Sequence, residues 1–358
     1  MKRSVLFLLS LVLICSNAFG QKKVLLESFT GARSANCPMG AYYADSMTVA
    51  HPNVIAVNLH SYFMQDSMYF NAEDTLAQAY AVGVPMGAVD RINHPSGVAV
   101  GYAQWDSNIQ QRLIDTPRVD VTMSSVWDSA SRDITTHVQV SILSNLDSGD
   151  YRMSLYVVED SVTGIGSGYD QANGYNATVG NPFFGKGNPI VGFIHRHVVR
   201  ALLPSAWGLA GVFTVTPTTG QNYAHIFHYT LPANYNENKI SLVAFVSAYT
   251  ADHLGDSVLN AAQEKLVVHP VVAGITGSRQ NSFSIYPNPS NGEMTFSSGN
   301  SKQYTLCLYN TLGQMVFKKY FVGATNVAKA FLGHSGLYYA KIMQGSEQVA
   351  VITVTFSD

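Results

Sequence analysis

The order of hydrophobic and polar positions divides the chain into regions of different periodicity. In residues 21–115, short apolar runs with polar boundaries predict buried strands at Lys23–Phe29, at Asn53–His60 and from Gly83 onward. The segments between these runs predict helices at Met39–His51 and Ala72–Tyr80. Because strands and helices that alternate in this way are typical of an α/β layer structure, we expect an α/β domain here.

Residues 116–275 change to a period of two. The alternating runs are RVDVTMSSVW, DITTHVQVSIL, YRMSLYVVED, HIFHYTL and KISLVAFVSAY. Because turns rich in Asp, Asn, Gly and Ser separate these runs, they predict an antiparallel β-sandwich domain. The insert Gly164–Asn188 interrupts the alternation and is rich in Gly, Asn and Tyr. Loops of this length in compact domains are usually functional or mobile, so the insert is a candidate ligand contact.

Two further segments complete the predicted organisation. Residues 1–20 have a basic start, an apolar run to Cys15 and the small-x-small site Ala18-Phe19-Gly20, which together are typical of a secretory signal peptide. A polar linker at 276–282 precedes short alternating strands with Gly, Pro and Asn turns. Residues 283–358 are therefore expected to form a small C-terminal β-sandwich.

The composition excludes some classes of function. Charged residues make up 12% of the chain, against about 25% in ordinary soluble domains, which suits an extracellular β-rich protein. A formal net charge of −2 provides no basic field, so nucleic acid is not expected as a partner. Only Cys37 and Cys307 follow the signal peptide, and they lie in different predicted domains, so no disulfide framework is expected. The sequence indicates no cofactor.

The segment Glu27–Pro38, ESFTGARSANCP, lies between the first predicted strand and the first predicted helix. Together with Gly83-Val84-Pro85 before a later strand, it resembles the thioredoxin-like domain of the outer membrane protein twenty-eight-related family of Bacteroidetes. The resemblance implies a thioredoxin-like fold in which Pro85 is cis and faces a C-x-x-C loop. In this chain the two positions of that loop are Ser34 and Cys37.

The substitution at the first of these positions changes the expected chemistry. Thiol–disulfide exchange needs an attacking thiolate and a second thiol that resolves the mixed disulfide. Ser34 holds the attacking position, and its hydroxyl is not appreciably ionised at neutral pH, so we expect a degenerate, redox-inactive domain. Two alternatives stay open. Cys37 could serve an unusual thiol enzyme, or Ser34 could act as a nucleophile with His60 or His94 as its base.

A pair of histidines follows the insert in the segment His195-Arg196-His197. Alternate residues of a strand share a face, so His195 and His197 could chelate a metal ion with a third ligand. His225 and His228 are candidates for the third ligand, although residues three apart on a strand do not share a face. The other interpretation is that these imidazoles form structural hydrogen bonds.

Six tripeptides consist of Asp, then Ser or Thr, then an apolar residue. They resemble the O-glycosylation signal of Bacteroidetes, which implies sugars on Ser46, Ser67, Thr75, Ser129, Ser161 and Ser257. Asp-Ser pairs are also frequent in turns and helix caps, which is the alternative interpretation.

Three motifs in the last region form a joint signal. They are Tyr286-Pro287-Asn288-Pro289, the segment YNTLGQ with Gly313, and the segment SGLYY with Gly336 and Tyr338. In this order they closely resemble the C-terminal sorting domain of type IX secretion cargo. The resemblance implies that the type IX secretion machinery and its sorting protease are partners. It also implies attachment to anionic surface polysaccharide and a final location outside the cell or on its outer surface.

The sequence therefore predicts a secreted or cell-surface protein that reaches its destination through the periplasm. We expect a non-enzymatic binding or scaffolding protein with an unknown extracellular ligand. The alternatives are a thiol enzyme that uses Cys37 and a metal-dependent site at His195 and His197.

Overall fold

The computed structural model describes residues 20–268, 283–311, 314–328, 332, 335–345 and 347–357. The chain divides into two compact units, Met1–Pro270 and Val271–Asp358. The predicted linker and all but the last residue of the predicted signal peptide lie outside the described residues. None of the helices in the described residues is both long enough and apolar enough to cross a membrane.

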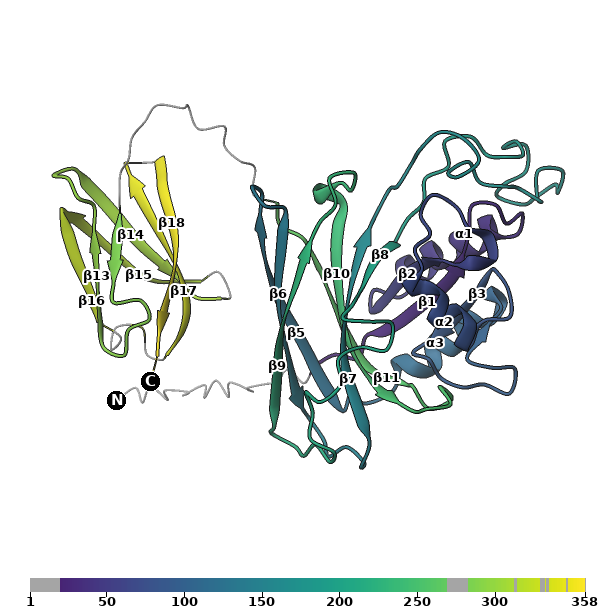
Figure 1. The fold of residues 1–358 in the computed structure, drawn as a ribbon, viewed down its shortest axis with the longest axis horizontal. Coiled ribbons are helices and arrows are strands. Elements are labelled where there is room, and N and C mark those ends of the chain that lie inside the picture. The colour runs from purple at the N-terminus through teal and green to yellow at the C-terminus, as the bar shows by residue number, and fades with distance from the viewer. Residues whose placement is uncertain are drawn as a thin grey trace, which may run out of the picture. The chain divides into compact units, whose positions relative to one another are not determined.

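An eight-stranded sheet runs through the first unit in the order β11-β10-β7-β8-β2-β1-β3-β4 (Figure 1). Its strands are β1 (Val24–Thr30), β2 (Val54–His60), β3 (Met86–Val89), β4 (Ala99–Val100), β7 (Asp150–Glu159), β8 (Val198–Leu203), β10 (Ile240–Tyr249) and β11 (Val258–Lys265). β1 and β2 are parallel, and every residue of both is buried. Both faces of these strands are covered, which explains why their sequences are nearly continuous apolar runs.

The described part of the first unit has three α-helices: α1 (Cys37–Ala50), α2 (Ala72–Tyr80) and α3 (Trp105–Leu113). Figure 1 shows them gathered at the β1–β3 end of the sheet. The first two confirm the predicted helices, whereas the sequence did not reveal α3. Its apolar stripe is narrow, because among its nine residues only Trp105, Asn108 and Ile109 are buried. Single-turn 3₁₀ helices lie at Tyr62–Met64, Tyr102–Gln104 and Glu237–Lys239.

A second, three-stranded antiparallel sheet consists of β5 (Val119–Asp128), β6 (Asp133–Ile142) and β9 (Asn222–Thr230). The inward side chains of β6 alternate with exposed or half-buried ones and are Ile134, Thr136, Val138, Val140 and Ile142. The apolar ones among them share one core with residues of β7 and β10. The antiparallel β-structure predicted from the period-two runs is confirmed.

The two regions predicted as separate domains contribute strands to the same sheet. β2 pairs with β8 in parallel at Asn58 and Val198. Between the regions, the buried Arg91 guanidinium forms two 2.7 Å contacts with the Glu27 carboxylate and donates to the hydroxyl of Tyr156 at 2.7 Å. The predicted boundary at 115–116 falls between α3 and β5 and stays a prediction, but the structure places both regions in one compact unit.

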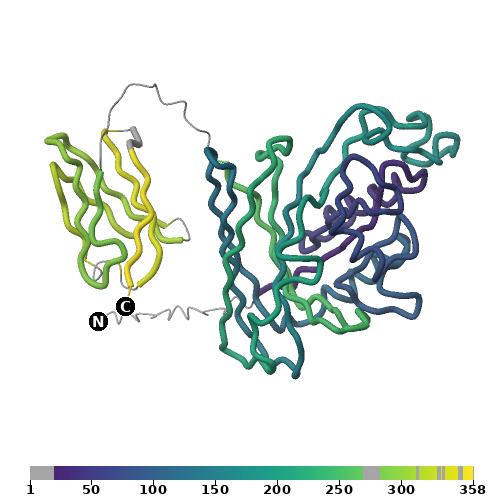
Figure 2. Tube along the Cα trace, viewed as in Figure 1, coloured from purple at the N-terminus to yellow at the C-terminus, as the bar shows by residue number. Residues whose placement is uncertain are grey.

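The second unit consists of two antiparallel sheets around one core. One sheet has the order β12-β13-β16 and the other β15-β14-β17-β18. The strands are β12 (Ser284–Tyr286), β13 (Glu293–Ser297), β14 (Gln303–Tyr309), β15 (Met315–Val322), β16 (Ala324–Ala328), β17 (Gly336–Gln344) and β18 (Glu347–Phe356). The tube in Figure 2 shows the described part of this unit as strands and turns throughout.

Candidate functional site

The loop between β1 and α1 carries the predicted Ser34 and Cys37. Pro38 occupies the first turn of α1, where its missing N–H leaves no hydrogen bond unmade. Ser34 is 4% exposed and Cys37 is fully buried. Burial raises the pKa of the Cys37 thiol, while hydrogen bonds with the side chains of Ser34 and Thr30 act in the opposite direction and do not cancel the effect of burial. A buried thiol with a raised pKa supplies little thiolate at neutral pH.

Pro85 lies next to the first turn of α1. The Val84–Pro85 peptide bond is cis, as the resemblance implied. A Cβ atom added at Gly40 of α1 would come within 2.6 Å of Pro85 Cβ, so glycine is what allows the proline to approach the helix so closely.

An aspartate holds the other side of the same loop. Asp66 Oδ2 accepts a 2.6 Å hydrogen bond from the Ala32 backbone N–H and lies 2.6 Å from His60 Nδ1. Asp66 Oδ1 accepts from the Met68 backbone N–H at 2.8 Å. Burial raises the pKa of Asp66, but the hydrogen bonds and the His60 imidazole outweigh burial and bring this pKa below its ordinary value. Asp66 is therefore an ionised anchor for the loop.

The insert covers this loop through one glutamine, Gln171, which is 2% exposed. Its Nε2 donates to the carbonyl oxygens of Ala32 at 3.0 Å and Ser34 at 2.9 Å, and lies 3.4 Å from the carbonyl oxygen of Gly31. Three carbonyl groups of the loop thus lie around one buried amide. The sequence did not reveal this contact, because 137 positions separate Gln171 from Ser34.

The backbone of the insert also pairs with the loop. The Ala172 N–H donates to the Ala32 carbonyl at 2.7 Å, and the Gly174 N–H donates to the Ala35 carbonyl at 2.8 Å. A Cβ atom at Gly174 would lie 3.1 Å from the Ala35 carbonyl oxygen, which explains the glycine at this close approach. The insert therefore occupies the hydrogen-bonding edge of the Ser34–Cys37 loop.

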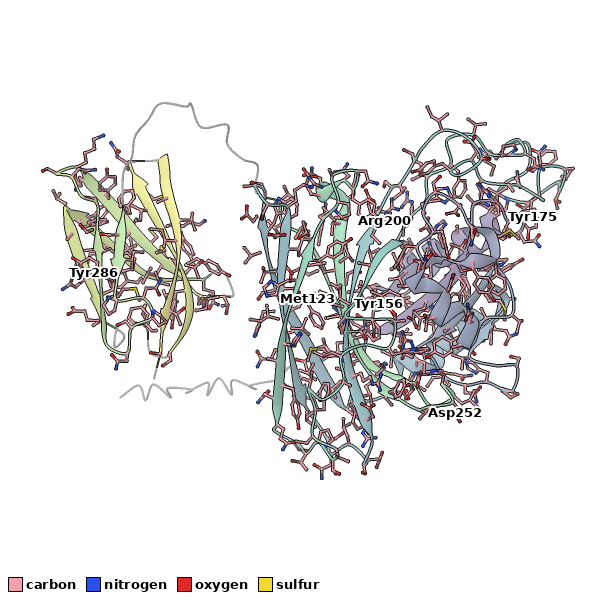
Figure 3. The ribbon with its side chains drawn as sticks, in the orientation of Figure 1. Met123, Tyr156, Tyr175, Arg200, Asp252 and Tyr286 are labelled. Atoms are coloured by element: carbon pink, nitrogen blue, oxygen red, sulfur yellow. The ribbon has the colours of Figure 1, made fainter. Side chains whose placement is uncertain are left out.

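The insert is itself held by side-chain hydrogen bonds. Asn173 is 1% exposed, and its Nδ2 donates to the carbonyl oxygens of Phe183 at 3.0 Å and Gly187 at 2.8 Å. Asn176 Oδ1 accepts from the Gly187 N–H at 2.8 Å. Tyr175, labelled in Figure 3, has its pKa raised to about 12 by burial and by a hydrogen bond with Tyr102. The Asn-rich composition thus builds a fixed shape without a hydrophobic core of its own.

His195 and His197 do not lie on one strand, because β8 begins only at Val198. His195 is buried, its Nε2 lies 2.7 Å from the Tyr169 carbonyl oxygen, and burial together with the nearby His60 lowers its pKa to about 4. His197 has a left-handed backbone, and its Nε2 lies 3.2 Å from Asp45 Oδ1. The prediction that His195 and His197 share one strand, on which the metal hypothesis was based, is therefore wrong. The two imidazoles bond to different groups.

The other candidate ligands do not complete a metal site in the described residues. His225 and His228 lie on β9 of the three-stranded sheet, where His228 Nδ1 is 3.2 Å from Thr135 Oγ1. Within the described ranges, no group of three or more His, Cys, Asp or Glu side chains is arranged to hold a metal ion.

The six predicted glycosylation positions differ in exposure. The exposed ones are Ser67, Thr75 and Ser129, and the half-buried ones are Ser46, Ser161 and Ser257. Within the tripeptides, the Asp256 side chain is buried and accepts from the Tyr80 hydroxyl at 2.7 Å. All three residues of the tripeptide that starts at Asp128 are exposed, at the end of β5 and in the turn that follows it. Ser129 is therefore the position that an enzyme could reach most easily in the folded protein.

The predicted sorting motifs have structural roles in the second unit. Asn288 joins the turn after β12 to β18, because its side chain donates to the Thr353 carbonyl at 3.0 Å and accepts from the Thr355 N–H at 2.9 Å. The peptide bonds before Pro287 and Pro289 are cis, and Tyr286 is exposed. Gly336 begins β17 with a φ of 156°, and Tyr338 is buried in the core. Gly313 lies outside the described residues.

Comparison with known families gives two matches. The family described as outer membrane protein Omp28 matches residues 73–269, and the family described as secretion system C-terminal sorting domain matches residues 284–354. None of the curated proteins matches this sequence.

The chain also resembles solved structures. HBP35 of Porphyromonas gingivalis is 18% identical over 94% of this chain and 98% of that chain, with a TM-score of 0.53. A protein of Agrobacterium tumefaciens is 13% identical over 70% of this chain and 98% of that chain, with a TM-score of 0.43. A domain of the outer membrane lipoprotein Omp28 of P. gingivalis is 14% identical over 43% and 91%, with a TM-score of 0.25. The similarity to HBP35 concerns the fold.

Proposed function

The chain belongs to the outer membrane protein Omp28 family, and from this premise we propose that it is a non-enzymatic binding or scaffolding protein with a redox-inactive thioredoxin-like region. Family membership and the type IX sorting domain together indicate export to the outer cell surface. The sorting domain also implies interaction with the type IX secretion machinery. The role of the protein at the cell surface is inferred from the Ser34–Cys37 loop and the insert.

The arrangement of residues 21–115 supports a thioredoxin-like fold. A β1-α1-β2 unit is followed by the antiparallel hairpin of β3 and β4 and by α3, and the four strands lie in the order β2-β1-β3-β4. Pro85 precedes β3 and packs against Gly40 of α1, on the side where the resemblance places the redox loop. This topology and the resemblance in the loop sequence agree with each other.

The observation that carries the proposal is the burial of Cys37 beneath the insert. Thiol–disulfide exchange requires a thiolate that a substrate disulfide can approach in line. Ser34 cannot attack, Cys37 has no exposed surface, and Gln171 bonds to the carbonyl groups of the loop between β1 and α1. The hydrogen-bonding edge at which a substrate peptide could pair is already occupied by Ala172 and Gly174. The loop therefore serves as a structural support for the insert.

The outer side of the insert supports a binding role. Large apolar side chains that are 47–100% exposed in and just after the insert are Ile165, Val179, Phe184, Val191 and Ile194. The ring centres of Phe183 and Phe193 are 6.3 Å apart. Because Val191 and Ile194 are close to Phe193 in sequence, this contact brings them near Phe184. Exposed apolar side chains on a rigid, hydrogen-bonded loop are typical of surfaces that contact a partner. We place the contact with the unknown extracellular ligand here.

A disulfide-reduction assay tests the redox part of the proposal. The full-length protein and its Cys37→Ser variant are each added to insulin and dithiothreitol, and the rate of insulin precipitation is measured. We expect both to match the rate without protein, because no accessible thiolate is present. Catalysis by the wild type that Cys37→Ser abolishes would instead establish the thiol enzyme.

Removal of the tail by a sorting protease, attachment to anionic polysaccharide and O-glycosylation complete the proposal. They are supported by the sorting motifs and by the exposed tripeptide at Ser129. The intact mass of the protein recovered from the cell surface measures tail removal and O-glycosylation. We expect a chain that begins at Gln21, ends near residue 280 and carries sugar increments, one of which Ser129→Ala removes.

A further inference from the structure

The second unit has a sheet face that its core does not use. On β14, the side chains of Tyr304, Leu306 and Leu308 are buried in the core. The alternate residues of β14, among them Cys307, therefore point to the opposite face of the β15-β14-β17-β18 sheet. The same alternation on β17 buries Ala340 in the core.

Two lysines flank Cys307 on this opposite face. Lys318 of β15 pairs with Cys307 on one side, and Lys341 of β17 pairs with it on the other. The Lys318 ammonium lies 5.6 Å from the centre of the Tyr320 ring, and the Lys341 ammonium lies 4.9 Å from the centre of the Tyr309 ring. We call the surface formed by these five residues the lysine–tyrosine face.

The lysine–tyrosine face is hollowed. An open cavity of about 560 Å³ is lined by Cys307, Tyr309, Lys318 and Tyr320, together with the apolar Met315 and Met343. None of the described residues that line this cavity carries a carboxylate. The described residues of the face thus offer positive charge and apolar surface to a partner.

We propose that the lysine–tyrosine face binds an acidic, extended peptide segment of the type IX secretion machinery. Lys318 and Lys341 lie on strands on either side of β14, so their backbones are about 9.5 Å apart, twice the spacing of neighbouring strands. Carboxylates two residues apart on an extended chain point to the same side and lie about 7 Å apart, and the flexible lysine side chains span the remaining difference. The tyrosine rings and Met315 would contact the aliphatic parts of such a segment.

The neighbouring Lys319 provides a matched control. It carries the same charge on the same strand, but it alternates with Lys318 and its ammonium donates to the Asn326 carbonyl of β16 at 3.4 Å. An acidic segment on the lysine–tyrosine face would not contact it. Charge reversal at Lys319 changes the net charge of the protein as much as charge reversal at Lys318 does.

The binding test uses full-length protein and poly-L-glutamate at low ionic strength. We expect Lys318→Glu/Lys341→Glu to weaken binding about tenfold or more, since each lost charge contact contributes up to about 1 kcal/mol. Lys318→Glu alone, which changes the net charge as much as Lys319→Glu does, should weaken binding about fivefold, and Lys319→Glu should stay within about twofold of wild type. Equal effects of Lys318→Glu and Lys319→Glu, or tighter binding of an acidic polysaccharide than of poly-L-glutamate, would overturn the proposal.

The export test uses the cells that secrete the protein. We expect Lys318→Glu/Lys341→Glu to accumulate in the periplasm while Lys319→Glu reaches the surface. The milder Lys318→Gln/Lys341→Gln variant and the thermal unfolding of each purified chain separate loss of binding from loss of folding. Surface delivery of a folded double variant at the wild-type level contradicts the proposal. This result would leave the binding role of the insert untouched, because the insert lies in the other unit.

Discussion

At the scale of single residues, Glu73 is the most unusual group of the first unit. It lies in the first turn of α2, is fully buried, and neither carboxylate oxygen has a hydrogen-bond partner of normal geometry in the described part of the chain. Burial, and then the charge of Asp66, raise the pKa of Glu73 well above its ordinary value. At pH values between its unfolded and its folded pKa, folding therefore requires Glu73 to take up a proton.

Replacement of Glu73 by Gln removes this requirement. A carboxyl group with a raised pKa in the folded state contributes stability that is fully present below its unfolded pKa, near 4.5, and is lost as the pH rises through the folded pKa. We expect the melting temperature of Glu73→Gln to rise relative to wild type between pH 5 and pH 8, by about 2–4 °C for each kcal/mol involved. Thermal unfolding at both pH values measures this difference.

The control for this prediction is Asp147→Asn, which removes a carboxylate whose side chain is 86% exposed. Its melting temperature should follow that of the wild type at both pH values, because exposed ion pairs contribute little. If Glu73→Gln also follows the wild type, Glu73 is ionised in the folded protein and the account given for it is wrong.

At the scale of elements, the insert and the loop between β1 and α1 stabilise each other. Gln171 bonds to carbonyl groups of that loop, and Asp66 holds the loop from its other side. Both contacts join loop segments that lie outside the strands and helices. The burial of Cys37 therefore depends on tertiary hydrogen bonds and is sensitive to the loss of one of them.

Gln171→Ala should expose Cys37. Removal of the amide takes away its buried hydrogen bonds to the Ala32 and Ser34 carbonyl groups, at about 0.5–1.5 kcal/mol each, and favours local opening of the insert. We expect iodoacetamide to modify Cys37 about tenfold faster or more than in the wild type, as measured by peptide mass spectrometry. Gln139→Ala, at an exposed position of β6, should leave the rate unchanged. Equal rates in all three proteins would show that the insert does not protect the thiol.

At the scale of the whole molecule, the residues up to Pro270 form one compact unit although their sequence patterns differ. The Glu27–Arg91–Tyr156 network lies where the helical region meets the β-sandwich, and Arg91 is also within 5.2 Å of the Phe245 ring centre. A buried charge network of this kind couples the two regions, because separation would leave charges without partners. We expect them to unfold in one transition.

Arg91→Ala should destabilise the whole first unit. It leaves the Glu27 carboxylate buried without its cation, which costs about 3–5 kcal/mol. Arg118→Ala removes the exposed pair with Asp147 and should cost about 0–1 kcal/mol. Chemical denaturation followed by fluorescence and circular dichroism measures both values. Separate transitions for residues 21–115 and for the β-sandwich would contradict the coupling.

The sequence was sufficient for most elements of the fold. The predicted strand at Asn53–His60 and the predicted helix at Ala72–Tyr80 agree with β2 and α2 to within one residue, because burial on both faces or on one stripe leaves a clear local period. It did not reveal α3, whose buried stripe is narrow, and it extended a strand over His195 and His197. In the structure, His195 forms an isolated bridge to Val162 and His197 has a left-handed backbone, so the regular strand begins only at Val198.

The sequence by itself determined the local elements, the loss of the attacking cysteine at Ser34 and the presence of a sorting tail, since each depends on residue type and short spacing. Only the tertiary structure decided that the insert covers Cys37, that the Glu73 carboxylate is buried with no hydrogen-bond partner among the described residues, and that both regions of the first unit share one sheet. These properties depend on contacts between residues far apart along the chain, such as Gln171 and Ser34. A local pattern records whether a side chain is to be buried, but not which segment buries it.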